Sequence, residues 1–401
     1  MMMLYRFSMT SHRWRRAAAG VLLIASISGA FCIYGLQFTP SHIVSRCSRA
    51  QYRMVCYTDS INAVMRHRGL SAAFDVLAAA YAADADFAAS CHGNTHDLGN
   101  AAYEQYHRTG MIELTPKASY CAYGFYHGFM EALLAQTHDL DEARAFCAFA
   151  GRQVPVPAGY AEGACYHGIG HGVTDGSVPS EWGNAEAMAA PGLALCSQVA
   201  PTDEWRRRCY SGVFNSLALL YRDPKYKLDP RHDPFGICGL QAYDTLEKEA
   251  CYGEMNTLVV FMGHRNLAAS LAYTRFIADA HYRSLATRSA ADFYVKLSAS
   301  GSAHISVADL AMCQSLGAPF EDDCIGGLTD GIWEFGQPGR QYEQALALCG
   351  SNELPWDRSQ ACYAHIQESA SMLYGPEIIP KICALVPDPF KVPPCTPDTH
   401  V

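Results

Sequence analysis

The segment that decides the fold reads Cys165-Tyr166-His167-Gly168-Ile169-Gly170-His171-Gly172. Related segments recur along the chain and open at Cys91, Cys121, Cys165, Cys209, Cys251, Cys324 and Cys362. The spacings between these cysteines are 30, 44, 44, 42, 73 and 38 residues, and self-similarity at such a period is typical of helical-repeat proteins. Because 73 is close to two repeats, the stretch 266–300 is predicted to be one repeat without cysteines.

A second set of cysteines ends the helix that is expected before each opening cysteine. Pairing each cysteine with its neighbour predicts eight disulfides: Cys47–Cys56, Cys91–Cys121, Cys147–Cys165, Cys196–Cys209, Cys238–Cys251, Cys313–Cys324, Cys349–Cys362 and Cys383–Cys395. Seventeen cysteines are far above average usage, which favours an oxidising compartment where disulfides persist. The cysteine left over is Cys32.

The stretches 71–83 and 343–348 are rich in alanine and leucine and lack the period-two alternation of strands, which favours helix. The predicted fold class is therefore all-α. Disulfide-pinned helix pairs would form an α-solenoid or a closed α/α toroid, after an N-terminal transmembrane anchor. This arrangement resembles the Sel1-like and tetratricopeptide-type repeats that are pinned by disulfides. The resemblance covers about residues 91–395 in architecture, with wider cysteine spacing here, and it implies no catalytic residues.

The N-terminal segments predict a membrane anchor. Residues 1–16 are basic, and the uncharged stretch 17–36 has the length of a membrane-spanning helix. The basic tail would remain in the cytoplasm and leave the body outside it, in the periplasm of a bacterium. A cleaved signal peptide is the alternative, because 28–30 are small residues, and the protein would then be secreted. A helical cap is expected over 37–90 and the repeat domain over 91–401, with its part at 91–180 rich in histidine.

The charge distribution argues against a nucleic-acid partner. The chain has a formal charge of −9, with 30 basic and 39 acidic residues. Four arginines belong to the basic tail, so the remainder carries 26 basic residues against 39 acidic ones, a charge of −13. Phosphate binding needs a basic face. The sequence also lacks a Gly-rich phosphate loop, a nucleophile elbow and a Cys-x-x-Cys redox pair.

Alignment of the repeats on their opening cysteines exposes a column of polar residues. Its members are His96, His127, His171, Asn215, Asn256, Asp330 and Glu368. His92 and His167 precede two of them by four residues, and Glu131, Asp175 and Glu334 follow others by four. Residues four apart share one face of a helix. The column therefore predicts a polar surface along the inner helices.

Pairs of histidines at this spacing can reach one metal ion, as can a histidine and a carboxylate. The predicted metal ligands are His92, His96, His127, His167 and His171. They suit a divalent or redox-active ion, either iron, zinc, manganese or copper. The other interpretation is that these rings hydrogen-bond across neighbouring helices as a repeated packing device.

Four carboxylates are the candidate catalytic residues. Glu131 and Asp175 would bind the ion or carry protons, and Asp330 and Glu334 could act as general acid and base. In a closed ring, Asp330, Glu334 and Glu368 would share a cavity with the histidines, whereas in an open superhelix they would lie far apart. A metal-activated water would make the protein a hydrolase and a redox-active ion an oxygenase. The alternative function is a non-catalytic scaffold whose inner repeat surface binds a protein or peptide partner.

Overall fold

The computed structural model describes residues 38–154, 160–230, 232–298, 305–373 and 378–396. Throughout these ranges the regular secondary structure is helical and no strand occurs, which confirms the all-α prediction. The predicted basic tail and membrane anchor, 1–16 and 17–36, lie outside the described residues. Among the helices that are described, none is long and apolar enough to cross a membrane.

The segment expected to form the N-terminal cap contains four helices. They are α2 (Pro40–Cys47), α3 (Arg53–Arg68), α4 (Leu70–Ala83) and α5 (Ala85–Ala89). Helix α4 packs against both α2 and α3. Its alanine-rich sequence, with the bulky side chains of Phe74 and Leu77 fully buried, makes a flat face against which other helices can pack closely.

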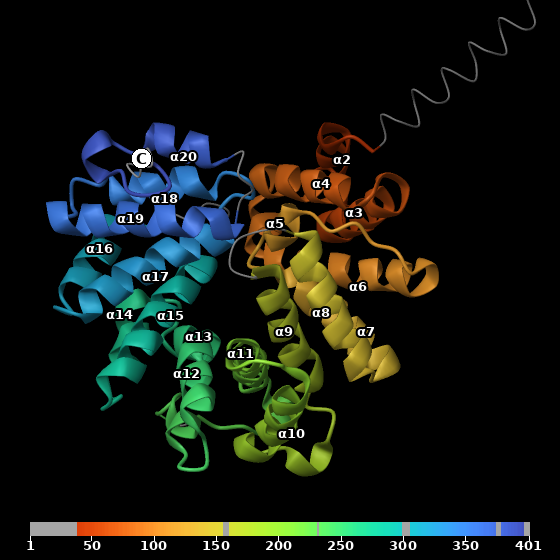
Figure 1. Ribbon diagram of the computed structural model, residues 1–401, viewed down its shortest axis with the longest axis horizontal. Coiled ribbons are helices and arrows are strands. Elements are labelled where there is room, and N and C mark those ends of the chain that lie inside the picture. The colour runs from red at the N-terminus through yellow and green to blue at the C-terminus, as the bar shows by residue number, and fades with distance from the viewer. Residues whose placement is uncertain (1–37, 155–159, 231, 299–304, 374–377, 397–401) are drawn as a thin grey trace, which may run out of the picture.

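A series of inner helices follows, each packed against the next. The series is α6 (Cys91–Thr109), α7 (Gly124–Thr137), α9 (Tyr160–Val173), α11 (Asp203–Leu220), α12 (Thr245–Glu254), α13 (Asn256–Met262), α15 (Ala280–Ser298) and α17 (Phe320–Phe335). Figure 1 shows them running from α6 and α7 on the right, through α9 and α11 below, to α15 and α17 on the left. The inner helices carry all residues of the polar column except Glu368, which lies on a later helix.

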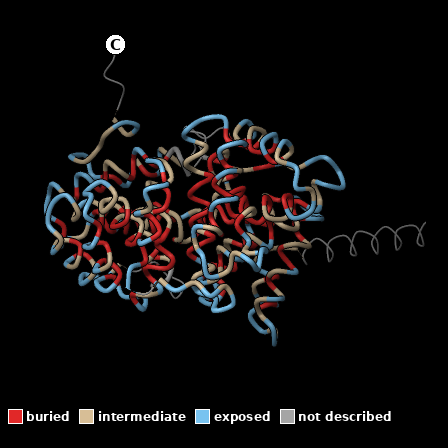
Figure 2. The backbone as a smooth tube through the Cα atoms, turned by 90° about the horizontal axis from the view of Figure 1, so that it is seen from below, coloured by how far each residue is buried: buried red, intermediate tan, exposed pale blue. Residues whose placement is uncertain are grey.

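The remaining helices pack beside the inner series or follow it. They are α8 (Leu140–Gln153), α10 (Ala185–Val199), α14 (Leu267–Thr274), α16 (Val307–Gln314), α18 (Gln341–Cys349), α19 (Trp356–Leu373) and α20 (Ile379–Leu385). The stretch 266–300 contains the pair α14 and α15, which packs together without a disulfide. Buried segments run through the interior, and exposed ones lie mainly at the outer loops (Figure 2).

Several helices begin at side chains that cap the free backbone N–H groups of the first turn. Asp244 and Glu247 form a reciprocal capping box at the start of α12, and the Thr202 hydroxyl accepts from the N–H of Trp205 in α11. Such caps each stabilise a helix by about 1 kcal/mol. They fix where each helix starts, and hence which side chains face inward.

Glycines let the inner helices approach one another closely. A Cβ atom on Gly128 of α7 would overlap the carbonyl oxygen of His96 in α6. In the same way, a Cβ atom on Gly212 of α11 would overlap the carbonyl oxygen of His167 in α9. Only glycine leaves room for backbone at these crossings. The short distances between helix axes bring side chains of neighbouring helices within reach of each other.

The eight predicted disulfides are confirmed, with the predicted partners in every case. The opening cysteines do not all stand at the first residue of a helix. Cys91 does, but Cys165 and Cys209 lie more than a turn inside α9 and α11. Each of these two bonds therefore ties the preceding helix to the flank of the inner helix and not to its tip.

Two hydrogen bonds join the end of α17 to the beginning of the repeats. The backbone N–H of Ala122, just before α7, donates to the carbonyl oxygen of Glu334 at 3.0 Å. The Tyr81 hydroxyl of α4 donates to the carbonyl oxygen of Phe335 at 2.6 Å. The last inner helix thus contacts both the cap and the second repeat.

Candidate metal centre

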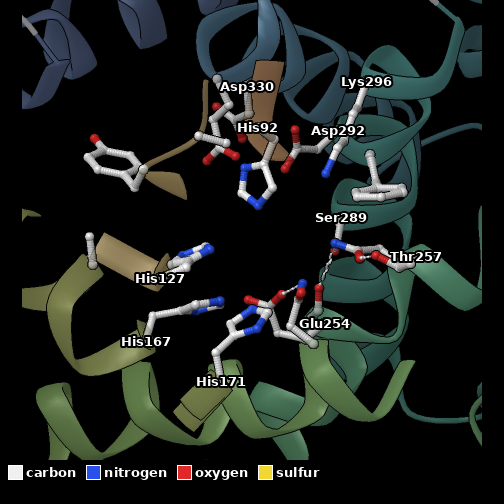
Figure 3. A pocket seen from close by; sticks show the side chains of 18 of the residues that line it. His92, His127, His167, His171, Glu254, Thr257, Ser289, Asp292, Lys296 and Asp330 are labelled. Carbon is white, nitrogen blue, oxygen red and sulfur yellow. Dashed lines mark hydrogen bonds between the residues drawn. The ribbon is translucent and has the colours of Figure 1, made fainter. Parts of the chain in front are cut away.

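Five histidines from three consecutive inner helices converge on one region. Helix α6 provides His92 and His96, α7 provides His127, and α9 provides His167 and His171. Within the groups His92/His96/His127 and His127/His167/His171, one nitrogen from each ring lies within 4.8 Å of the others. Figure 3 shows four of these rings projecting toward the same cavity. All five predicted metal ligands are therefore brought together.

The rings of His92 and His96 present two acceptor nitrogens to each other. Nδ1 of His92 lies 2.8 Å from the carbonyl oxygen of Cys121, and Nδ1 of His96 lies 3.2 Å from Oε2 of Glu131. A carbonyl or carboxylate oxygen can only accept, so both Nδ1 atoms carry the proton. The two Nε2 atoms, 3.1 Å apart, then both carry lone pairs. Such an approach is favourable only with a cation, a proton or a metal ion, between or beside them.

Two further imidazole nitrogens are buried without a hydrogen-bond partner. They are Nδ1 of His127 and Nε2 of His171, and both side chains are only 6% exposed. The other nitrogen of His171 lies 2.9 Å from the hydroxyl of Ser216. A buried polar atom left unpaired costs about 1–3 kcal/mol. Coordination of an ion by these nitrogens would remove that cost.

Glu131 holds two of the histidines in place. Its two carboxylate oxygens lie 3.2 Å from Nδ1 of His96 and 3.8 Å from Nδ1 of His171. Burial opposes ionisation of Glu131, but its hydrogen bond and electrostatic interaction with His96 outweigh burial and lower its pKa. A carboxylate behind an imidazole fixes the ring's orientation and tautomer. Glu131 is thus placed to orient the His96 ring, and its role as a ligand or proton carrier stays a prediction.

Burial favours the neutral form of four of the five histidines. Burial, reinforced by nearby positive charge, lowers the pKa of His92, His127 and His171 well below the usual imidazole range. It lowers the pKa of His167 to about 3. Neutral imidazole is the form that binds metal ions. Protons therefore compete weakly for these nitrogens near pH 7.

A strained turn positions the hydrogen-bond partner of His92. Cys121, Ala122 and Tyr123 have φ angles of 56°, 56° and 59°, the left-handed region that non-glycine residues rarely adopt. The disulfide Cys91–Cys121 and the hydrogen bond from Ala122 to Glu334 hold this turn. Strain of this kind persists where the surroundings enforce it and is common at functional sites.

The histidines form one wall of a cavity of about 610 Å³. Charged residues from later inner helices make up the opposite side, namely Glu254, Arg288, Asp292, Lys296, Asp330 and Glu334. Figure 3 shows His127, His167 and His171 on one side and Asp292 and Lys296 on the other. Asp330 and Glu334 thus share the cavity with the histidines.

Several carboxyl groups of this acidic wall have raised pKa values. Burial raises the pKa of Glu254 to about 7. Hydrogen bonds to its carboxylate, such as the one that the Asn215 amide donates at 2.9 Å, oppose this rise. Burial and repulsion from neighbouring carboxylates raise the pKa of Glu334 to about 8, and they also raise the pKa of Asp292. Carboxyl groups with such pKa values can act as general acids and bases near pH 7.

Asp330 has the opposite environment from Glu334. It accepts from Nε of Arg288 at 2.7 Å and lies 2.6 Å from Nε2 of His365. Burial opposes its ionisation, but these two partners outweigh burial and lower its pKa. Asp330 and Glu334 lie one helical turn apart, and their pKa values are shifted in opposite directions. In active sites, such opposite shifts distinguish a general acid from a general base.

Two members of the predicted polar surface lie elsewhere. Helix α9 ends at Val173, so Asp175 is not on the helical face that carries His171. The Asp175 side chain is exposed and accepts from the N–H of Ser177 in a turn. Glu368 of α19 is also exposed and does not line the cavity. The other six residues of the polar column do line it.

Several residues of the acidic wall do not belong to the polar column and were not predicted from the sequence. Arg288, Asp292 and Lys296 follow one another at intervals of four on α15, in the repeat without cysteines. That repeat could not be aligned with the others because it has no opening cysteine. The spacing of these charged residues at intervals of four was nevertheless visible in the sequence and could have identified them. Glu254 stands two positions before Asn256 of the polar column.

Comparisons with protein-family models, with curated proteins and with solved structures found no match. The buried histidine clusters have the composition and spacing of groups that could bind a metal ion.

Proposed function

We propose that this protein binds a transition-metal ion through its histidine cluster and uses it in catalysis. The observation that carries the proposal is the 3.1 Å approach of the Nε2 atoms of His92 and His96, whose other nitrogens are both committed as donors. A single proton shared between the two Nε2 atoms would satisfy only this pair of histidines. A metal ion would also satisfy the unpartnered nitrogens of His127 and His171.

The geometry of the pair suits a metal with imidazole ligands. Two nitrogens 3.1 Å apart, each about 2.05 Å from one ion, subtend an angle of about 100° at it, between the octahedral and tetrahedral values. Imidazole donors favour zinc, copper and iron over manganese, which prefers oxygen. The five histidines are enough to supply one ion or two.

The cavity favours chemistry on a small molecule over the binding of a protein or peptide. Its volume of about 610 Å³ lies within the range of about 300–1,000 Å³ that is usual for small-molecule sites. Glu254 and Glu334 line the same cavity and retain protons near neutral pH. A metal-activated water facing such groups would make the protein a hydrolase. If the ion is copper or iron, oxygenase chemistry is the alternative.

We further propose that the repeats form a closed α/α toroid. The successive packing of the inner helices and the contacts of α17 with Tyr81 and Ala122 support this arrangement. The eight disulfides are consistent with a location outside the cytoplasm, and the basic and apolar segments at 1–16 and 17–36 support a membrane anchor there.

The metal content of the purified chain tests the proposed function. The full chain, produced without a tag in an oxidising compartment, should contain about one or two metal ions per molecule by inductively coupled plasma mass spectrometry. The variant His127→Ala/His171→Ala should lose most of this metal. The matched variant His232→Ala/His281→Ala, which removes two exposed histidines, should retain it. A native chain that takes up no metal, even when supplied with zinc, copper and iron, would refute the proposal.

A further inference from the structure

Lys296 projects into the cavity across from His127, His167 and His171, and His92 lies on the side nearer to it (Figure 3). Its Nζ atom lies 4.8 Å from the ring centre of Phe293 and 5.2 Å from that of Phe335. Within the part of the chain that the structure describes, no carboxylate oxygen lies within ion-pair distance of it, although Asp292 and Glu334 line the same cavity. The ammonium group is therefore flanked by aromatic rings and lacks a counterion in contact.

The carboxyl groups near this cation attract it without forming an ion pair. Burial lowers the pKa of Lys296 to about 8, so most molecules remain charged at pH 7. The charges of Glu334 and Asp292 favour the ammonium form, but burial and mutual repulsion raise the pKa of both carboxyl groups and so weaken this attraction. Arg288, the other cation of α15 that lines the cavity, is already paired with Asp330. Lys296 thus differs from Arg288 in having its charge available.

A buried charge is costly unless a partner of opposite sign meets it. The cavity lies between Lys296 and the histidines, and its volume of about 610 Å³ leaves room for a small organic molecule. The rings of Phe293 and Phe335 offer apolar surface next to the ammonium group. An anionic head with an apolar body would match both features.

We propose that Lys296 forms the anion-binding subsite of the substrate pocket, and that the substrate is a small organic acid whose carboxylate or phosphate-like group contacts Nζ. This inference rests on the proposed function, because it places the reacting part of the substrate at the ion held by the histidines. The anionic group anchors one end of the molecule, and the metal acts on the other.

The test compares matched probes on the metal-loaded full chain by isothermal titration calorimetry. Benzoate and phenylphosphonate carry the two kinds of anionic group, and benzamide is the neutral counterpart of benzoate. The wild-type chain should bind at least one anion about tenfold or more tightly than benzamide. Lys296→Met should abolish this preference, while Lys296→Arg, which keeps the charge, should retain it. Equal binding of anion and amide, no binding of either anion, or a preference that survives in Lys296→Met would overturn the inference.

A second measurement on the wild-type chain does not depend on the folding of a variant. Acetic anhydride at pH 8 should acetylate Lys296, and saturating benzoate or phenylphosphonate should protect it, as read by peptide mass spectrometry. The exposed Lys381 is the internal control and should react equally with and without the anion. Metal content is measured in the same samples. If the chain takes up no metal but still shows Lys296-dependent anion binding, only the proposed function is refuted. If the chain contains metal but shows no Lys296-dependent anion binding, only this inference is refuted.

Discussion

The backbone N–H of Ala122 donates a 3.0 Å hydrogen bond to the carbonyl oxygen of Glu334. Ala122 belongs to the turn that supports His92, whereas Glu334 belongs to the acidic wall on the other side of the cavity. One main-chain bond therefore connects the first repeats, which supply the histidines, with the helix that supplies two of the carboxyl groups. The two sides of the site are positioned by each other as well as by their own helices.

Glu131→Gln should weaken metal binding although all five histidines remain. The carboxylate orients His96 and His171, and loss of such a partner typically lowers metal affinity by about 10- to 100-fold. Competition with a chromophoric chelator measures the change. Glu104→Gln, an exposed acid on the neighbouring α6, is the control and should bind metal like the wild type. Unchanged affinity in Glu131→Gln would show that Glu131 has no orienting role.

Gly128→Ala should destabilise the fold. The added methyl group would overlap the carbonyl oxygen of His96 and force α6 and α7 apart, and overpacking of this kind costs about 1–3 kcal/mol. Gly93→Ala on α6 is the matched control, because nothing lies within 4 Å of its added Cβ atom. Urea denaturation should show Gly93→Ala to be as stable as the wild type or slightly more stable. Equal stability of the two variants would contradict the role assigned to the close crossing.

The disulfide framework could be predicted because each bond is local in sequence. A cysteine that ends one helix and a cysteine near the start of the next lie close in any helix-pair repeat, whatever the overall curvature. The convergence of His96, His127 and His171 followed from the same alignment, since the repeats share a register. Asp175 was misplaced because helical spacing was extended beyond Val173, where α9 ends.

The acidic wall could not be predicted in the same way. Arg288, Asp292 and Lys296 lie on α15, whose repeat contributes no cysteine with which to set the register. Whether Glu334 approaches the histidines depends on the curvature of the whole array, which arises from many small packing angles between helices. Helical period and motif spacing do not reveal the curvature that these packing angles produce together.

Glu254→Gln should change how stability depends on pH. In the folded metal-free chain, Glu254 keeps its proton up to about pH 7, whereas in the unfolded chain it loses the proton near pH 4.5. Between these values the folded state binds more protons, so this group makes the free energy of unfolding fall as pH rises, by at most about 1.4 kcal/mol per pH unit. The substitution removes this contribution.

Urea denaturation of the metal-free chain at pH 5 and pH 7.5 measures the effect of that substitution. Relative to the wild type, Glu254→Gln should gain stability between the two pH values. Glu104→Gln again serves as the control for loss of an exposed carboxylate and should give a nearly constant difference. A Glu254→Gln difference that is also constant would mean that Glu254 titrates normally in the folded chain.

Removal of the Cys91–Cys121 bond should affect both stability and the metal site. Replacing both cysteines with serine should cost about 3–4 kcal/mol for a loop of 30 residues. It should also loosen the left-handed turn that presents the Cys121 carbonyl to His92, and so lower metal affinity. Removal of Cys47–Cys56, with a separation of 9 residues, should cost about 2.5 kcal/mol and leave metal affinity unchanged. Equal effects of the two double variants on metal affinity would show that the turn does not support the metal site.

Every disulfide joins two cysteines that are consecutive among those of the described chain, and the widest separation is 30 residues. During synthesis each cysteine therefore meets its correct partner before the next pair has been made. Oxidation that keeps pace with the emerging chain then gives the native pairing directly, with little need for an isomerase to reshuffle bonds. The histidine-bearing helices would be locked in register while the acidic wall is still being translated, so the order of the residues along the chain also sets an order of assembly for the site.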